Sequence, residues 1–401
     1  MQHKLLSEIK NTILGEQMLI YNSLFKYNNR LNDAHKQHRS LLTSVGKMVR
    51  TNFTLHFTDI IQSVRTAATH TNDCNFNCSL LTKHNIATVC TAIELIHIAS
   101  LIHDDIIDNS SKRRGFQTLH CQTDTKTATL VGDALIVRSI HILDNMQNVS
   151  QGVKYSLTQV VLKQINNLIV GEMSGISLKK PLPLTELVMQ YNAIVNKKTS
   201  SMFTLGVQMV CILATTGQQN SYHTATAFNV NNTPYDLTNI SLAFGIAFQI
   251  KDDMSDWQHC YNATTVAVSN KNKTSLTLNT FKKHNKVALK ELYADLKNKE
   301  TNFPIILLNE HEPKLISSSI SILQKTTDGS EQFNHQILKI KQAFIKYDIW
   351  NKCNKYIDKE IQNINTTINI FYSNFIGEQK VNNQNNCNNT PFCNFCNYIL
   401  Q

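Results

Sequence analysis

Two short acidic motifs hold the residues whose types and spacing are best suited to chemistry. Both read D-D-x-x-D, and their carboxylates are Asp104, Asp105, Asp108, Asp252, Asp253 and Asp256. On a helix, positions i and i+4 lie on one face, so the outer aspartates of each motif would stack. Such stacking destabilises a helix unless a cation lies between the charges, and Mg²⁺ binds through a few carboxylates together with waters and substrate phosphates. The motifs predict two helix ends that bind Mg²⁺ and a phosphorylated ligand; the alternative is two solvated acidic faces.

Two adjacent arginines, Arg113 and Arg114, follow the first motif closely. A guanidinium group binds phosphate oxygens bidentately, while metal ions neutralise the remaining charge. The pair therefore favours a diphosphate as the ligand. The alternative is an exposed basic turn.

The segments that must position these motifs are apolar. Each motif ends an apolar run, within residues 86–108 and from 242 onward. A helix that is apolar on every side is a buried one. The chain has only 12 glycines and 6 prolines in 401 residues, which favours long, uninterrupted helices. We therefore predict an all-α fold, with helices at 1–45, 86–108, 124–146, 152–175, 184–216, 236–257 and 313–372.

The domain organisation predicted from composition is one all-helical domain over residues 1–375. Residues 258–288 are polar and predict an inserted surface loop, and residues 376–401 read as a loosely held, low-complexity Asn/Cys tail. Within this tail, Cys393 and Cys396 form a C-x-x-C pair near Cys387, which could hold zinc. Unpaired thiols are the favoured interpretation.

The charge balance narrows the classes of partner. A net charge of +10 fits nucleic acid, anionic membrane or anionic small substrates. Charged residues are only 17% of the chain and no run of five lysines or arginines occurs, which disfavours nucleic acid and leaves phosphorylated substrates. No clean apolar run of 18 residues predicts a transmembrane segment. Scattered cysteines and an N-terminus without a clear targeting peptide predict an intracellular, reducing location, cytoplasm or mitochondrion.

A series of motifs in fixed order resembles the trans-prenyl diphosphate synthases, which include farnesyl, geranylgeranyl and long-chain polyprenyl diphosphate synthases. Around the two acidic motifs, the matching residues are Gly46–Arg50 (G-K-x-x-R), Glu94–His97 and Ser100–Asp105, Gly132–Leu135 (G-D-x-L), Gly171–Glu172, Lys198–Thr199, and Gly245 with Phe248–Gln249. The resemblance covers about residues 40–310 and continues more weakly to about 372.

The chain departs from the family pattern at several positions. Thr51 replaces the usual proline after Arg50, and Gly175 stands where a glutamine often follows the G-E pair. The stretch after Asp256 is longer than usual. Lys290 takes the place of a family lysine whose neighbouring glycine and proline are missing.

The resemblance implies a helical barrel around one deep central cavity and a Mg²⁺-dependent condensation of isopentenyl diphosphate with an allylic diphosphate. Two or three Mg²⁺ ions are implied, for which Mn²⁺ can substitute. The implied metal ligands are Asp104, Asp105, Asp108, Asp252 and Asp256, with Asp253 in support. The implied contacts of the allylic diphosphate are Arg113, Lys198, Thr199, Gln249 and Lys290. Those of isopentenyl diphosphate are Lys47, Arg50, His97 and Arg114.

The length of the product is predicted from the helix before the first motif. Ala99 and Ser100 lie about one turn before Asp104, where short-chain members of the family carry bulky aromatics. Further back on the same face come Leu95 or Ile96, then Ala92 and Thr88. From Ala92 to Asp104 a helix rises about 18 Å, room for a product of roughly thirty carbons or more, suited to the side chain of a quinone such as ubiquinone. The alternatives are another helix that closes the floor, and a farnesyl or geranylgeranyl diphosphate product.

Other functions stay open. A non-catalytic or regulatory subunit of a heteromeric prenyl synthase would share the motifs, although such subunits tend to lose metal ligands. A terpene cyclase would carry one D-D-x-x-D but lacks the isopentenyl site of Lys47, Arg50 and His97. The predicted assembly is a homodimer or a heteromer with a related subunit, with peripheral membrane contact as a route for releasing the product.

Overall fold

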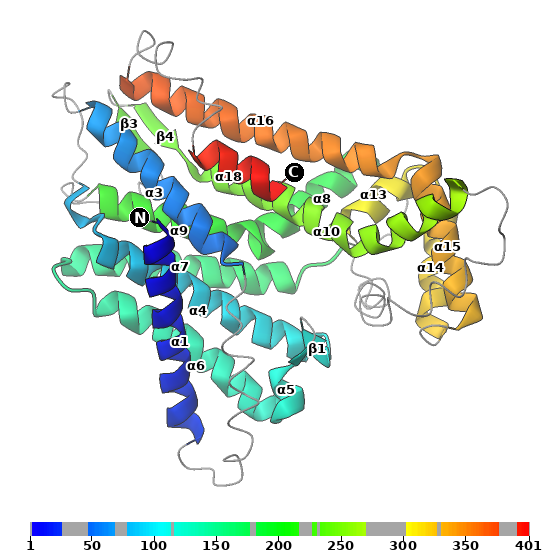
Figure 1. The fold of residues 1–401 in the computed structure, drawn as a ribbon, viewed down its shortest axis with the longest axis horizontal. Helices are drawn as coiled ribbons and strands as arrows, with labels where there is room; N and C mark the ends of the chain where they lie inside the picture. The colour runs from blue at the N-terminus through cyan, green and yellow to red at the C-terminus, as the bar shows by residue number, and fades with distance from the viewer. Residues whose placement is uncertain are drawn as a thin grey trace. The chain divides into compact units, whose positions relative to one another are not determined.

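The computed structural model describes residues 2–25, 47–68, 78–113, 116–176, 182–215, 227–230, 233–269, 302–326, 330–376 and 391–400, and most of them are helical. The helices are α1 (Gln2–Phe25), α3 (Val49–Ala68), α4 (Lys83–Ile107), α5 (Leu119–Gln122), α6 (Thr125–Asp144), α7 (Gln151–Glu172), α8 (Leu184–Lys198), α9 (Ser200–Ala214), α10 (Thr238–Ser269), α13 (Phe303–Asn309), α14 (Pro313–Lys325), α15 (Glu331–Lys346), α16 (Ile349–Ile376) and α18 (Pro391–Leu400). The 3₁₀ turn η2 (Cys78–Leu80) precedes α4. Figure 1 shows this helical chain, and the all-α prediction is confirmed.

The described strands form two small antiparallel hairpins. In the first, β1 (Lys112–Arg113) pairs with β2 (Phe116–Gln117). In the second, β3 (Ala227–Val230) pairs with β4 (Thr233–Asp236). The first hairpin lies directly after the first acidic motif and fixes the backbone of Arg113.

The contacts divide the chain into two compact units. Unit 1 comprises Met1–Asn167, Ser201–Leu242 and Ile364–Tyr398, and unit 2 comprises Leu168–Ser200, Ala243–Asn363 and Ile399–Gln401. The single domain over 1–375 stays a prediction. The first acidic motif belongs to unit 1 and the second to unit 2.

Helix α4 is a core element of unit 1. It contacts α6, α1 and α3, and its apolar residues from Ile86 to Ile102 are largely buried. The Thr82 hydroxyl caps its first turn by accepting from the backbone N–H of Asn85. Among the described helices, α4 is the one long and apolar enough to cross a membrane, but most of its apolar stretch is buried inside the protein. A buried core helix explains the same composition.

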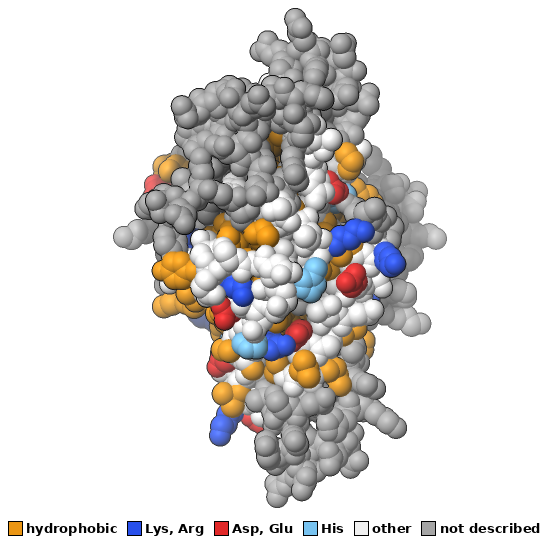
Figure 2. All heavy atoms as spheres, turned by 90° about the vertical axis from the view of Figure 1, so that its left-hand side faces the viewer, with side chains coloured by type: hydrophobic (Ala, Val, Ile, Leu, Met, Phe, Trp, Pro, Cys, Tyr) orange, Lys and Arg blue, Asp and Glu red, His pale blue; other side chains and the backbone are white. Residues whose placement is uncertain are grey.

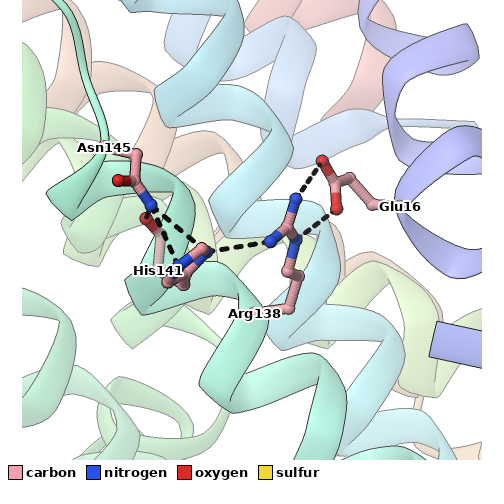
Figure 3. A network of polar contacts seen from close by, with 4 residues as sticks. All are labelled: Glu16, Arg138, His141 and Asn145. Atoms are coloured by element: carbon pink, nitrogen blue, oxygen red, sulfur yellow. Dashed lines mark hydrogen bonds and ion pairs between the residues drawn. The ribbon is translucent and has the colours of Figure 1, made fainter. Parts of the chain in front are cut away.

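An ion pair fastens α1 to α6 within unit 1. The guanidinium of Arg138 donates through both Nε and Nη2 to the carboxylate of Glu16 (Figure 3). Its Nη1 lies 2.8 Å from Nδ1 of His141, whose ring also contacts the amide of Asn145. This two-pronged geometry fixes the direction of the α1 helix better than apolar contact alone.

Unit 2 packs its shorter helices against one another. Helix α13 contacts α8, α14 and α15, and α14 pairs with α15. Trp257 of α10 packs edge-on against Phe344 of α15, with ring centroids 4.9 Å apart. The fully buried Phe303 opens α13, after Asn302 caps its first turn.

Two segments predicted to lack regular structure are helical where residues are described. Residues 258–269 continue α10 as helix, because nothing in this stretch interrupts it: it contains neither glycine nor proline. Residues 270–288 lie outside the described residues. In the tail, residues 391–400 form α18. Here the apolar positions Phe392, Cys393 and Cys396 share one face and are buried, so an amphipathic helix was hidden by the asparagine-rich composition.

The predicted helix over 184–216 is broken. Its residues form α8 and α9, which meet at Thr199. The remaining helix predictions agree with the structure where residues are described: 1–45 with α1, 86–108 with α4, 124–146 with α6, 152–175 with α7, 236–257 with α10 and 313–372 with α14, α15 and α16.

Candidate active site

The first acidic motif lies at the C-terminal end of α4, in unit 1. Asp108 is the C-cap of this helix, and its backbone N–H bonds the carbonyl of Asp104. The carboxylate of Asp105 turns inward and is 6% exposed. Burial raises the pKa of Asp105, while the charge of Arg113 opposes that rise. The outer carboxylates, Asp104 and Asp108, are only partly buried.

The hairpin after this motif brings an arginine to it. Nε of Arg113 donates to Oδ1 of Asp105 at 2.8 Å. The structure therefore places this guanidinium beside the motif, as the sequence predicted, and pairs it with the middle aspartate. Arg114 lies outside the described residues.

Three of the residues predicted to bind isopentenyl diphosphate lie in unit 1. Nη1 of Arg50 is 3.1 Å from Nε2 of His97, and its guanidinium lies over the ring of Phe203 at 5.5 Å, within the range of a cation–π contact. Lys47 is exposed just before α3. The structure brings Arg50 and His97 together.

The G-D-x-L motif explains how α6 lies so close to α4. A Cβ atom on Gly132 would overlap the ring of His103. Nε2 of that ring is 3.4 Å from a carboxylate oxygen of Asp133. The glycine thus lets α6 lie directly against His103, the residue before the first motif.

The second acidic motif lies on α10, in unit 2, and its middle carboxylate is also turned inward. Asp253 is 7% exposed, and both of its oxygens accept hydrogen bonds. Oδ2 accepts from the hydroxyl of Tyr191 and from the backbone N–H of Phe303, each at 2.8 Å. Oδ1 accepts from Nε2 of Gln249 at 2.9 Å. Asp252 is exposed, and Asp256 belongs to the described helix by its backbone.

Asp253 is buried, and the groups that donate hydrogen bonds to it carry no formal charge. Burial raises the pKa of Asp253 to about 6, against the opposing effect of the hydrogen bonds from Gln249, Phe303 and Tyr191. Because protein donors occupy both oxygens, Asp253 anchors α10 to α8 and α13.

Lys198 and Thr199, the K-T pair, lie at the break between α8 and α9. The hydroxyl of Thr199 donates to Oε1 of Gln249 at 2.6 Å, and Nζ of Lys198 lies 2.7 Å from a carboxylate oxygen of Glu172. A chain of bonds therefore runs from Asp253 through Gln249 to Thr199.

Two glycines make room for this break. A Cβ on Gly171 would lie 2.8 Å from the backbone nitrogen of Lys198, and one on Gly245 would lie 2.7 Å from the Cα of Ser200. Any larger residue would push α7 or α10 away from the α8–α9 junction. Close helix packing therefore explains why Gly171 and Gly245 are glycines.

Some contacts of the site were not predicted from the sequence. Tyr191 lies seven residues before Lys198 on α8, and only its helical spacing hinted at a shared face. The backbone donor of Phe303 has no side-chain signature. Thr51 donates to the buried Glu94, although the sequence marked Thr51 only as a departure. Lys290 lies outside the described residues.

The residues present fit Mg²⁺ in kind. Among the described residues, no three His, Cys, Asp or Glu side chains converge on a common metal position. Mg²⁺ keeps several waters and needs only one or two protein carboxylates beside substrate phosphates. Asp104 and Asp108 supply two such carboxylates on one face at the end of α4.

Charged side chains of both signs are mixed on the one face of the described residues that Figure 2 draws. Figure 2 shows one face on which basic and acidic side chains lie among apolar and uncharged ones. The net charge of +10 is therefore not gathered into one basic field on this face.

Comparison with known proteins gives a consistent result. A family model described as polyprenyl synthetase matches residues 34–307. A farnesyl diphosphate synthase of Haemophilus influenzae is 32% identical over 179 residues, 43% of this chain and 56% of the relative. An all-trans-nonaprenyl-diphosphate synthase of Rhodobacter capsulatus is 30% identical over 169 residues, 41% of this chain and 44% of the relative. The chain thus spans about half the length of these two relatives.

The fold is shared with solved structures. A geranylgeranyl pyrophosphate synthase from Lactobacillus brevis aligns over 96% of both chains, with a TM-score of 0.60 and 18% identity. At this identity the likeness shows the fold, and the predicted all-α, isoprenoid synthase-like fold is confirmed.

Proposed function

Because the chain belongs to the polyprenyl synthetase family, we propose that it is a Mg²⁺-dependent polyprenyl diphosphate synthase. It would add isopentenyl diphosphate units to an allylic diphosphate. The observation that carries this proposal is the family match over residues 34–307, a span that contains both D-D-x-x-D motifs.

Each residue group has a role in this proposal. Asp104 and Asp108 at the end of α4, and Asp252 and Asp256 on α10, would bind Mg²⁺, with Asp105 held beside the first pair. Bound Mg²⁺ supplies Lewis-acid assistance to the departure of diphosphate. The hydrogen bonds from Asp253 through Gln249 to Thr199 hold the side chains around the K-T pair in place before substrate binds. Such preorganisation lowers the cost of stabilising charge.

Each substrate would be held by its own set of cations. Arg50, which contacts His97, would bind the diphosphate of isopentenyl diphosphate, together with Lys47. Lys198, held by Glu172, would bind the allylic diphosphate, with Gln249 and Thr199 beside it. In the reaction the allylic C–O bond breaks, the double bond of isopentenyl diphosphate forms the new C–C bond, and a proton leaves.

One assay tests the function. Purified protein is incubated with labelled isopentenyl diphosphate, geranyl or farnesyl diphosphate and Mg²⁺, and the products are separated by chromatography. We expect an elongated prenyl diphosphate, its loss in EDTA, and its return with Mg²⁺ or Mn²⁺. Activity that survives EDTA would contradict the metal-dependent mechanism. Product that forms only after a related subunit is added would identify a non-catalytic or regulatory partner.

A long-chain product, suited to the side chain of a quinone, is the finer part of the proposal. Ala99, about one turn before Asp104, is fully buried on α4 and carries no bulky side chain, and Ala92, about two turns further back, is likewise small and buried. Ala99→Phe should then shorten the product to the farnesyl or geranylgeranyl class while leaving the first condensation intact. Val89→Phe, a buried position further from the motif, is the control. A wild-type product that is already farnesyl diphosphate, or an unchanged product from Ala99→Phe, would refute this part.

The assembly proposed is a homodimer or a heteromer with a related subunit. Its support is the apolar side chains that stay exposed on α6 and α7 within unit 1: Leu130, Val137, Tyr155 and Leu162. Light scattering after gel filtration would distinguish the two, because a homodimer forms from this chain alone. Val137→Glu should reduce the mass to that of one chain.

A further inference from the structure

The first turn of α3 is held from outside by a carboxylate of α4. Thr51, the third residue of α3, donates to Oε1 of Glu94 twice. Its backbone N–H lies 3.2 Å from that oxygen and its hydroxyl 2.8 Å. Both residues belong to unit 1 and are buried, with 0% of Thr51 and 5% of Glu94 exposed.

This contact has the physical character of a helix cap supplied by a neighbouring helix. The first four backbone N–H groups of a helix have no partner inside it, and the side chain of Met48, just before α3, offers no oxygen. Glu94 accepts one of these N–H groups, and a negative charge is favoured at the positive end of a helix. The hydrogen bonds in turn offset part of the cost of burying the carboxylate.

The same two turns carry the cation assigned to isopentenyl diphosphate. Arg50 precedes Thr51 directly, and His97 lies one turn after Glu94 on α4. Nη1 of Arg50 meets Nε2 of His97 at 3.1 Å, while the ring of Phe203 lies under its guanidinium. The first turn of α3 is therefore fixed at its backbone by Glu94 and at its arginine head by His97.

We propose that Glu94, acting through Thr51, is a positioning residue that sets how Arg50 is presented to the diphosphate of isopentenyl diphosphate. This inference rests on the function proposed above. Glu94 is buried, and its role in this proposal is to hold the first turn of α3, not to bind the substrate. The proline usual in the family at position 51 has no N–H and no hydroxyl, so the double contact depends on the threonine of this chain.

The test separates substrate binding from folding. Thr51→Val removes the hydroxyl at nearly constant shape, and Glu94→Gln removes the charge. Thr58→Val is the matched control, because Thr58 is also buried on α3 and its hydroxyl donates to the carbonyl of Thr54 in its own helix. Isothermal titration measures binding of isopentenyl diphosphate to the full chain without turnover, and steady-state kinetics then give KM and kcat for both substrates.

We expect Thr51→Val and Glu94→Gln each to weaken binding of isopentenyl diphosphate, and to raise its KM, by about tenfold, the effect of a buried acceptor that loses a partner. The KM of the allylic substrate and kcat should change by less than about twofold. Thr51→Ser, which restores the hydroxyl, should return the wild-type values. Thr58→Val should leave both substrates unchanged.

A double-mutant cycle shows whether the effect passes through Arg50. In the Arg50→Ala background, Thr51→Val should add little, because there is no guanidinium left to position. Full additivity, or equal effects on the two substrates, would overturn the proposal. Should Thr51→Val fail to fold, Thr51→Pro serves instead, since a first-turn proline is compatible with a helix. An unchanged affinity in that variant would overturn it equally.

The two proposals fail in different ways. A wild-type chain that neither binds nor condenses isopentenyl diphosphate refutes the proposed function. A wild-type chain that does both, beside Thr51 and Glu94 variants with unaltered affinity, refutes only the positioning role.

Discussion

The two D-D-x-x-D motifs share one sequence pattern, but their buried middle carboxylates have different kinds of partner. In unit 1, Asp105 is paired with the cationic Arg113, which stays about one third exposed. In unit 2, the donors to Asp253 among the described residues are neutral: Tyr191, Gln249 and the backbone of Phe303.

The two partners have different consequences: Arg113 neutralises the charge of Asp105, whereas the donors to Asp253 hold helices together. A guanidinium that is about one third exposed can lose its partner and be hydrated, so the ion pair in unit 1 can open at little cost. Three buried or half-buried donors that converge on one carboxylate cannot all be hydrated, so Asp253 is a fixed point of the fold. The carboxylates of Asp104 and Asp108 are partly exposed and that of Asp252 is exposed, so these outer aspartates stay open to solvent beside the buried middle ones.

The largest expected effect lies at the outer carboxylates. Asp104→Ala and Asp252→Ala should each lower turnover by roughly a hundredfold or more, comparable to the loss of one preorganised electrostatic group. Labelled isopentenyl diphosphate measures the rate, and circular dichroism should show an intact helical signal because relieving like-charge repulsion does not harm a helix. Asp144→Ala, at an exposed position of α6, is the control. A melted signal in either variant would point to a structural role instead.

The middle carboxylates should differ in stability. Asp253→Ala leaves the donors of Tyr191, Gln249 and Phe303 without an acceptor, so we expect a loss of about 3 kcal/mol or more in unfolding free energy. Asp105→Ala frees a guanidinium that water can reach, and should cost about 1 kcal/mol or less. Urea unfolding of both variants measures the contrast. Equal losses would remove the distinction between the two motifs.

How much of this contrast the sequence predicts depends on the kind of contact. The D-D-x-x-D spacing, the apolar run before each motif and the nearby Arg113 are all local, so the motif helices and the arginine beside the first motif could be predicted. The donors of Asp253 come from positions 191 and 303. No local spacing links these positions to the motif, and one of the donors is a backbone N–H.

The helix missed in the tail and the break missed at Thr199 have a similar cause. Composition averages over a window, whereas α18 depends on where three apolar residues fall within an asparagine-rich stretch. Likewise, the chain breaks between α8 and α9 at Thr199 without a glycine or proline at the break itself. Gly171 on α7 and Gly245 on α10 make room for it. Tertiary contact decides such local structure.

A third contrast concerns the substrates of the two units. Arg50→Ala should raise the KM of isopentenyl diphosphate about tenfold or more and leave that of the allylic substrate nearly unchanged, as expected for one charge-assisted contact. Lys198→Ala should do the reverse. Initial rates at varied concentrations of each substrate measure both. Equal effects on the two substrates would refute the assignment of one cation to each.

The smallest expected effect lies outside both motifs and shows whether acid sensitivity arises there. His56 on α3 stacks on Phe395 of α18, with ring centroids 4.8 Å apart, and its Nδ1 is buried without a hydrogen-bond partner among the described residues. Burial lowers the pKa of His56, against a smaller opposing effect of Asp59. The unfolded chain therefore binds a proton at a higher pH than the folded chain does. Stability must then fall as the pH drops below the unfolded value near 6.5.

His56→Phe keeps the stacked ring but cannot be protonated, so its urea midpoint should change less than that of the wild type between pH 7 and pH 5. His84→Phe, at an exposed position of α4, should behave as the wild type. If His56→Phe loses as much stability on acidification as the wild type, the acid sensitivity comes from groups other than the α3–α18 contact.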